Sequence, residues 1–157
     1  MEPIQRPPAI SRKILPPHWF LAAVLLEFLL HRFAPLAAVI PRPWTLSGAI
    51  AIAAGASIVG HAALLFRRSG TGIVPFSEAS SLVVAGPYRF TRNPMYLGMA
   101  LILTGIALLL GSATPFLVVP AFALLITRLF IVHEEAQMAA VFGHHYLALK
   151  QRVRRWI

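Results

Sequence analysis

The sequence predicts an all-α, polytopic integral-membrane protein with about four transmembrane helices and an amphipathic C-terminal helix on the cytoplasmic side. Of its 157 residues 58% are hydrophobic and only 12% are charged, a composition unlike that of a soluble domain. Prolines, glycines and arginines divide the chain into four apolar spans. The basic residues gather at alternate ends of these spans. We expect one membrane-embedded domain over residues 1–157, with a two-span region at 1–66 and a second region at 67–157.

The first apolar span covers residues 18–40, and we expect it to end at the Pro-Arg-Pro sequence that begins at Pro41. It has no small-residue cleavage site of the kind that ends a signal peptide. Glu27, His31 and Arg32 interrupt it. Because His31 follows Glu27 by one helical turn, we expect this acid to be interfacial or paired.

The second span covers residues 44–66, carries no charge, and is stopped by Arg67 and Arg68. Small residues recur four apart along it, at Ala51 and Gly55 and again at 56 and 60. Such a pattern lets another helix approach closely. We therefore expect a packed helix pair here.

Two further spans follow in the stretch from residue 93 to residue 127, which holds no charged side chain. The sequence GSATP at 111–115 divides it into spans of about 18 residues, which predicts a helical hairpin. In the tail, apolar residues recur at helical spacing and basic residues lie off that face. This pattern predicts an amphipathic interfacial helix broken near Gly143, attracted to anionic lipid.

The basic residues orient the spans. Twelve of the 14 lysines and arginines lie before the first span, between the second and third, or from the end of the fourth onward, whereas Arg32 and Arg42 lie in the remaining loops. Positive residues mark cytoplasmic loops. We expect an inner-membrane protein with both termini in the cytoplasm, on the same side as the loop at 67–93.

Composition also excludes several classes of site. The absence of cysteine excludes disulfides and thiol chemistry. The six histidines are scattered without carboxylates at ligand spacing, so no metal site is expected. The net charge of +9 does not indicate nucleic acid, because the basic residues lie between apolar spans rather than on one soluble face.

The stretch GPYRFTRNPMYLG, residues 86–98, has the features of an anion site at the mouth of the third span. Asn93 is the expected N-cap and Pro94 the first helical residue. Free N–H groups at a helix start, with the guanidinium groups of Arg89 and Arg92 beside them, suit a carboxylate or a phosphate. The alternative is that the arginines and tyrosines of this stretch anchor the helix among lipid headgroups.

Glu134 and Glu135 lie where the fourth span returns to the side that holds Arg92. Neighbouring residues on a helix point about 100° apart, so we expect one carboxylate to face the protein and the other to face water. The inward one could hold an ammonium or orient a sulfonium. The alternative is a solvated acidic pair at a helix end.

Together, RNPMYLG at 92–98 and the later EE pair resemble the integral-membrane methyltransferases related to isoprenylcysteine carboxyl methyltransferase, and phospholipid N-methyltransferases are similar. The family pattern is Arg-His-Pro-x-Tyr-x-Gly followed by Glu-Glu. The tail sequence Phe142-Gly143-x-x-Tyr146 also agrees, and the resemblance runs from about residue 71 to the C-terminus. Leu149 replaces a second tyrosine often found in the family's tail.

The resemblance implies an S-adenosylmethionine site without a Rossmann fold. Asn93 replaces the family's histidine, which removes a titratable group. The residues expected to act in catalysis are Arg92, Tyr96, Glu134 and Glu135. Those expected to bind the cofactor are Val84, Ala85, Gly86, Pro87, Tyr88, Arg92, Asn93, Tyr96, Leu97, Gly98, Glu134 and Glu135.

The implied reaction is methyl transfer to a lipophilic small molecule, a lipid or another membrane-associated acceptor that arrives from the bilayer. A carboxylate acceptor needs no base, whereas an amine or thiol needs one, for which Glu134 or Glu135 is the nearby candidate. A rival hypothesis is a four-span multidrug-type transporter that uses Glu27, since an intramembrane acid suggests function. The transporter hypothesis leaves the 86–98 stretch unexplained.

Overall fold

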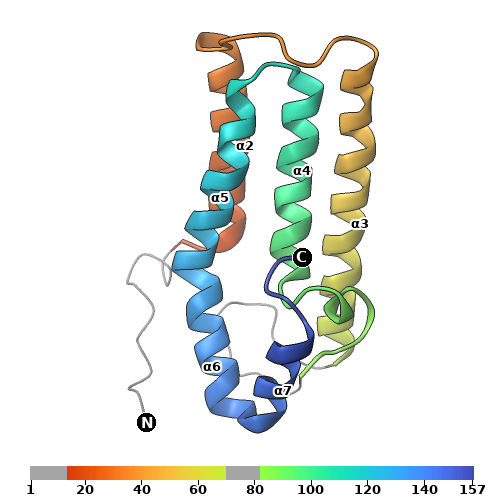
Figure 1. Cartoon of the computed structure of the whole chain (residues 1–157), viewed down its shortest axis with the longest axis vertical. Helices are drawn as coiled ribbons and strands as arrows, with labels where there is room; N and C mark the ends of the chain where they lie inside the picture. Colours follow the sequence, from red (N-terminus) through yellow and green to blue (C-terminus); the bar gives the residue numbers. More distant parts are fainter. Residues whose placement is uncertain (1–13, 70–81) are drawn as a thin grey trace.

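The computed structural model describes residues 14–69 and 82–157, and the regular secondary structure of these residues is helical, with no extended sheet. Four long helical segments stand side by side (Figure 1). They are α2 (Pro16–Phe33), α3 (Ser47–Arg68), α4 (Pro94–Leu110), and a rod that joins η3 (Thr114–Leu117), α5 (Val118–Ile126), η4 (Thr127–Ile131) and α6 (Val132–Phe142). Short turns η1 (Trp44–Leu46) and η2 (Gly86–Arg89) precede α3 and α4, and α7 (His144–Arg152) follows the rod.

Two of these segments are long and apolar enough to cross a bilayer, namely Trp44–Arg68 with 25 residues and Thr114–Phe142 with 29. Helix α4 is also apolar but has only 17 residues. Helix α2 has 18 residues and contains Glu27 and Arg32. The structure thus supports an all-helical membrane protein with two clear spanning helices, fewer than the four expected.

The ends of the helices follow local sequence signals, with one correction. The predicted hairpin is confirmed, because Gly111 adopts a φ of 72° and ends α4. The predicted break at Gly143, with a φ of 52°, is also confirmed. The first span was expected to reach Pro41, but α2 ends at Phe33. Ala34 precedes Pro35, and a residue before proline is disfavoured in the helical region.

The two loops at the upper end of Figure 1 are joined by backbone hydrogen bonds. The N–H groups of Val39 and Ile40 donate to the carbonyl of Gly111 at 2.8 and 3.1 Å. Ala113 N–H donates to the Ala37 carbonyl at 3.0 Å. These bonds hold the α2–α3 connection against the α4–α5 turn. The C-terminal ends of α3 and α6, the start of α4 and the tail therefore meet at the opposite end.

Helices α3 and α4 pack through glycines. A Cβ at Gly48 would lie 2.3 Å from the carbonyl oxygen of Gly105, and one at Gly55 would lie 2.6 Å from that of Gly98. The close approach of a second helix at Gly55 is as expected. At Gly60 nothing lies within 4 Å of an added Cβ, so the predicted pairing at 56 and 60 was wrong. The contact repeats every seven residues, which suits an antiparallel, slightly coiled helix pair.

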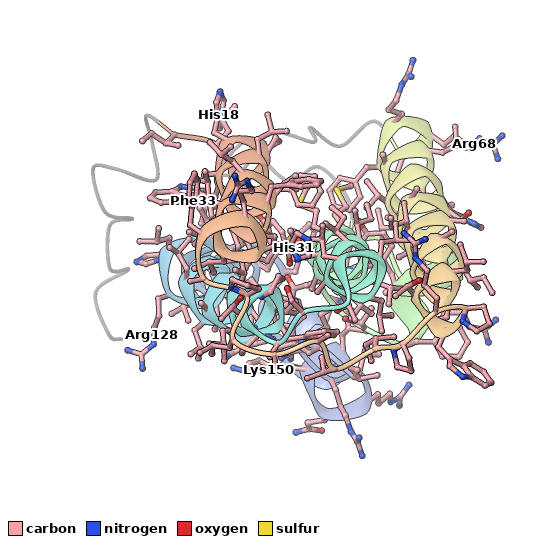
Figure 2. The ribbon with its side chains drawn as sticks, turned by 90° about the horizontal axis from the view of Figure 1, so that it is seen from above. His18, His31, Phe33, Arg68, Arg128 and Lys150 are labelled. Carbon is pink, nitrogen blue, oxygen red and sulfur yellow. The ribbon has the colours of Figure 1, made fainter. Side chains whose placement is uncertain are left out.

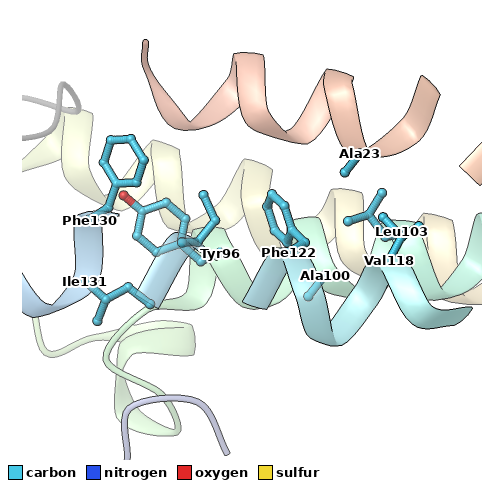
Figure 3. Packing of buried hydrophobic residues seen from close by; sticks show 9 residues of the cluster. Ala23, Tyr96, Ala100, Leu103, Val118, Phe122, Phe130 and Ile131 are labelled. Atoms are coloured by element: carbon cyan, nitrogen blue, oxygen red, sulfur yellow. The ribbon is translucent and has the colours of Figure 1, made fainter. Parts of the chain in front are cut away.

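Helix α2 covers the other side of α4 and α5 (Figure 2). Ala23 on α2 faces Leu103 of α4 and Val118 and Phe122 of α5 (Figure 3). In the same helix Glu27 is fully buried, and neither carboxylate oxygen finds a hydrogen-bond partner in the described part of the chain. Of the two expected alternatives for Glu27, interfacial or paired, the pairing with His31 or Arg32 was wrong.

His31 and Arg32, the expected partners of Glu27, contact other residues. His31 Nδ1 shares a 2.8 Å hydrogen bond with Ser112 Oγ in the α4–α5 turn. The Arg32 guanidinium lies 5.5 Å from the ring of Phe33. His31 is nearer the end of α2, where it reaches the turn, whereas Glu27 lies a full turn deeper in the bundle.

Candidate active site

The start of α4 is built differently from the expectation. Asn93 does occupy the N-cap position and Pro94 the first helical turn, but the Asn93 side chain makes no capping bond. Its Nδ2 instead donates to the backbone carbonyl of Arg155 at 3.0 Å. The backbone N–H of Asn93 donates to Thr91 Oγ1 at 3.2 Å. Thr91 supports the helix start, and Asn93 ties it to the C-terminal tail.

Glu135 lies between two arginines. Arg92 Nη2 donates to Glu135 Oε1 at 2.9 Å. Arg155 holds the same carboxylate with a fork, with Nε donating to Oε1 at 3.0 Å and Nη2 to Oε2 at 2.7 Å. The side chains of Arg92 and Glu135 are each 8% exposed, whereas that of Arg155 is 37% exposed. The hydrogen bonds to Glu135 raise the pKa of Arg155. Both carboxylate oxygens of Glu135 are therefore occupied by guanidinium groups.

Glu134, its neighbour, accepts a hydrogen bond from the Tyr96 hydroxyl at 2.9 Å. Arg92 lies two residues before α4 begins, and Tyr96 lies in the first turn of the helix. The start of α4 therefore supplies partners for both carboxylates. The expectation that one of the two would face water was therefore wrong. Helix α6 enters this region from η4, a π-helical turn, which is wider than an α-turn and is often found at functional sites.

Two further tyrosines lie near enough to the carboxylates to be affected by their charge. Tyr88 is buried, and its ring centroid lies 5.3 Å from that of Phe66 on α3. Burial, and then the charge of Glu134, raise the pKa of Tyr88 above its ordinary value. Burial, and then the charge of Glu135, raise the pKa of Tyr146 on α7 to about 12. Both phenols stay protonated near neutral pH, so neither can serve as a base there.

The final residues, 153–157, form a strap across the start of α4, which we call the C-terminal strap. Arg154 forms an isolated parallel bridge with Thr91, and its carbonyl accepts the Arg92 N–H at 3.0 Å. The Arg155 carbonyl accepts Thr91 Oγ1 at 3.1 Å. Trp156 Nε1 donates to Thr127 Oγ1 on the π-turn at 3.2 Å. These contacts hold the end of the tail against the start of α4 and the π-turn. The tail therefore forms part of the site, in addition to the interfacial helix that the sequence predicts.

The sequence analysis missed Thr91, Arg155, Trp156 and Thr127. One signal could have indicated Arg155: it is one of four basic residues in the tail, which was expected on the same side of the membrane as Glu134 and Glu135. The other three gave no comparable signal, because the bond from Thr91 to the strap joins residues 64 apart and the bond from Trp156 to Thr127 joins residues 29 apart.

Some predicted cofactor residues face α3 rather than the carboxylates. A Cβ added at Gly86, which has a φ of 57°, would lie 2.9 Å from His61 Nε2. Gly98 on α4 packs against Gly55 and Val59 of α3. Pro87 and Leu97 line a groove of about 360 Å³ on this side, together with Ser57, Ile58, His61, Phe90 and Thr91. Val84 and Ala85 precede η2 with exposed side chains.

Polar atoms for a ligand remain at the site. Arg92 Nε is buried and makes no hydrogen bond within the described residues, although a terminal nitrogen of the same guanidinium holds Glu135. Glu134 Oε1 has the Tyr96 hydroxyl as its hydrogen-bond partner, and no cation pairs with this carboxylate in the described ranges. A free guanidinium donor and an unneutralised carboxylate suit a zwitterionic ligand. S-adenosylmethionine, with a carboxylate and two cationic centres, fits this donor set.

Comparison with known proteins agrees with the sequence resemblance. A family model described as phospholipid methyltransferase matches residues 44–145. An uncharacterized protein of Haemophilus influenzae is 41% identical over 63 residues, which cover 40% of this chain and 100% of that protein. No solved structure matches. The comparisons give the transporter hypothesis no support. The matched region includes α3, α4 and the Glu134–Glu135 pair, and the chain belongs to the phospholipid methyltransferase family of integral-membrane methyltransferases.

Proposed function

We propose that this protein transfers a methyl group from S-adenosylmethionine to a lipophilic or membrane-associated acceptor at the cytoplasmic face of the membrane. The observation that carries the proposal is that Arg92, just before α4, and Tyr96, in its first turn, reach the Glu134–Glu135 pair on α6. These residues come from the two stretches of the family pattern. They lie together at the end of the bundle that holds the tail.

Arg92 and Glu134 would hold opposite ends of the cofactor. The free Nε of Arg92 would bind the cofactor carboxylate, and Glu134 would face its cationic centres. S-adenosylmethionine supplies a methyl group already activated on a sulfonium, so the protein has mainly to position the acceptor and exclude water. Tyr96 would fix the orientation of Glu134. Glu135, held by two arginines, would act as a scaffold.

The groove beside α3 supports an acceptor that comes from the bilayer. Its lining is mostly apolar, and two of the lining residues, Thr91 and Leu97, are the sequence neighbours of Arg92 and Tyr96. Helix α3 is itself long and apolar enough to span the membrane. For a carboxylate acceptor no base is needed. For an amine or thiol, Glu134 would take the proton, because both oxygens of Glu135 already hold guanidinium groups.

We also propose that all four long helical segments cross the bilayer, with both termini in the cytoplasm. The joined loops at one end and the basic residues at the other support this topology. Arg67 and Arg68 end α3 at the same end of the bundle as the strap. The basic residues before the first helix, Arg6, Arg12 and Lys13, lie outside the described residues.

The experiment is equilibrium binding of S-adenosylmethionine to detergent-solubilised protein, compared between Glu134→Gln and Glu135→Gln. Glu134→Gln keeps an acceptor for Tyr96 but removes the charge, so binding should weaken about ten-fold or more while the ligand-free melting temperature is retained. Glu135→Gln breaks a buried ion pair and should lower the melting temperature instead. Unaltered binding in Glu134→Gln, or no binding by the unsubstituted protein, would contradict the proposal.

A further inference from the structure

The contacts of Arg155 support a role for this residue in cofactor binding, an inference that rests on the proposed function. We infer that Arg155 is a positioning residue for the cofactor site: by holding both oxygens of Glu135, it keeps Arg92 free to bind a carboxylate. Arg155 lies in the C-terminal strap, beyond the part of the chain that matches the family model.

The geometry shows how the two arginines share one carboxylate. Arg155 uses Nε and Nη2 on the two oxygens of Glu135, which is the fork arrangement that binds carboxylates best. Arg92 reaches only Oε1, through Nη2, and its Nη1 makes a 3.5 Å contact with the Lys150 carbonyl. Arg92 Nε remains without a partner among the described residues. Arg155 thus binds both oxygens of Glu135, whereas Arg92 binds one of them and keeps its Nε without a hydrogen-bond partner in the described part of the chain.

Removal of the Arg155 guanidinium should change how Arg92 binds Glu135. Glu135 is 8% exposed, and a buried carboxylate that loses one of its two cations gains most by taking the remaining guanidinium as a fork. Arg92 is the nearest such group, already 2.9 Å away. Once it binds both oxygens of Glu135, its Nε is no longer available. The cofactor would then compete with Glu135 for Arg92.

The strap is placed to hold Arg155 in this role. The Arg155 carbonyl accepts hydrogen bonds from Thr91 and Asn93, on either side of Arg92 in the sequence. Trp156 anchors the end of the strap to Thr127 on the π-turn that leads into α6. The strap therefore connects both halves of the site, the start of α4 and the Glu134–Glu135 pair.

The test is a mutant cycle read by equilibrium binding of S-adenosylmethionine to solubilised full-length protein. Arg155→Met should weaken binding about ten-fold, which corresponds to about 1.4 kcal/mol. The double variant Arg155→Met/Glu135→Gln should bind more tightly than Arg155→Met alone, because a neutral amide no longer captures Arg92. Arg154→Met is the matched control, since its side chain is exposed and its contacts with the α4 start are made by backbone atoms.

The outcomes separate this inference from the proposed function. No binding by the unsubstituted protein would overturn the proposed function. Binding by the unsubstituted protein with equal binding by Arg155→Met would overturn the inference alone. A double variant that binds no better than Arg155→Met would also overturn it, because a purely structural role for Arg155 predicts no recovery when a second buried partner is removed. Melting temperatures recorded without ligand show that each variant compared is folded.

Discussion

Gly98 provides a sharp test of how the family motif is used, because the structure places it against Gly55 and Val59 of α3. In Gly98→Ala the added Cβ would lie 2.6 Å from Val59 Cγ2 and 2.7 Å from the carbonyl oxygen of Gly55. Overpacking costs about 1–3 kcal/mol. Alanine regains about 1 kcal/mol through helix propensity. The Gly55 carbonyl belongs to the backbone and cannot rotate away, so we expect an overpacking cost in the upper part of that range. After the gain in helix propensity, the free energy of unfolding should fall by about 1–2 kcal/mol.

The assay is a thermal melt of solubilised protein. A loss of that size should lower the melting temperature by about 2–8 °C. Gly60→Ala is the matched control, because nothing lies within 4 Å of its added Cβ and its melting temperature should stay level or rise. A melting temperature for Gly98→Ala at or above that of the unsubstituted protein would refute the close helix approach. An unchanged melting temperature with lost S-adenosylmethionine binding would return Gly98 to the cofactor pocket.

Three further predictions follow from the site and the bundle. Arg92→Lys keeps the charge but loses the free Nε donor, so S-adenosylmethionine affinity should fall about ten-fold or more, whereas the exposed control Arg128→Lys should bind normally. Equal affinities would show that Arg92 serves only as a partner of Glu135. Glu27→Leu removes a buried carboxyl that has no hydrogen-bond partner in the described residues and should raise the melting temperature, with a lower value arguing for an undetected partner. A topology reporter after Ile157 should be cytosolic and one at Gly111 should lie on the opposite side, and the same side for both would contradict the proposed topology.

The sequence alone was sufficient for features that depend on short stretches of chain. The lack of charge from residue 93 to residue 127 marked two apolar helices, and GSATP marked the turn between them. Gly111 and Gly143 end helices with positive φ values, which glycine adopts without strain. The pairing of the 92–98 motif with Glu134 and Glu135 was also visible, because both stretches belong to one family pattern.

The particular hydrogen-bond partners of the polar side chains could not be predicted from the sequence. Asn93 has the residue type of an N-cap, yet its side chain bonds the Arg155 carbonyl, 62 residues away. Glu27 has a histidine one turn along its helix, yet that histidine bonds Ser112 across the bundle. In each case a side chain with a suitable local partner found a distant one, since a folded bundle brings distant groups as close as local ones.

The sequence by itself determined that this protein is helical, belongs in a membrane and carries a methyltransferase motif, because hydropathy, helix breakers and motif residues act locally. The tertiary structure alone decided which partners each of the two carboxylates, Glu134 and Glu135, would bind. Glu135 meets Arg92 and Arg155, which lie 43 and 20 residues away, while Glu134 meets Tyr96, 38 residues away. Spacing along one helix fixes only the angle between the two carboxylates. Which partner each one meets depends on how α4 and the C-terminal strap pack against α6.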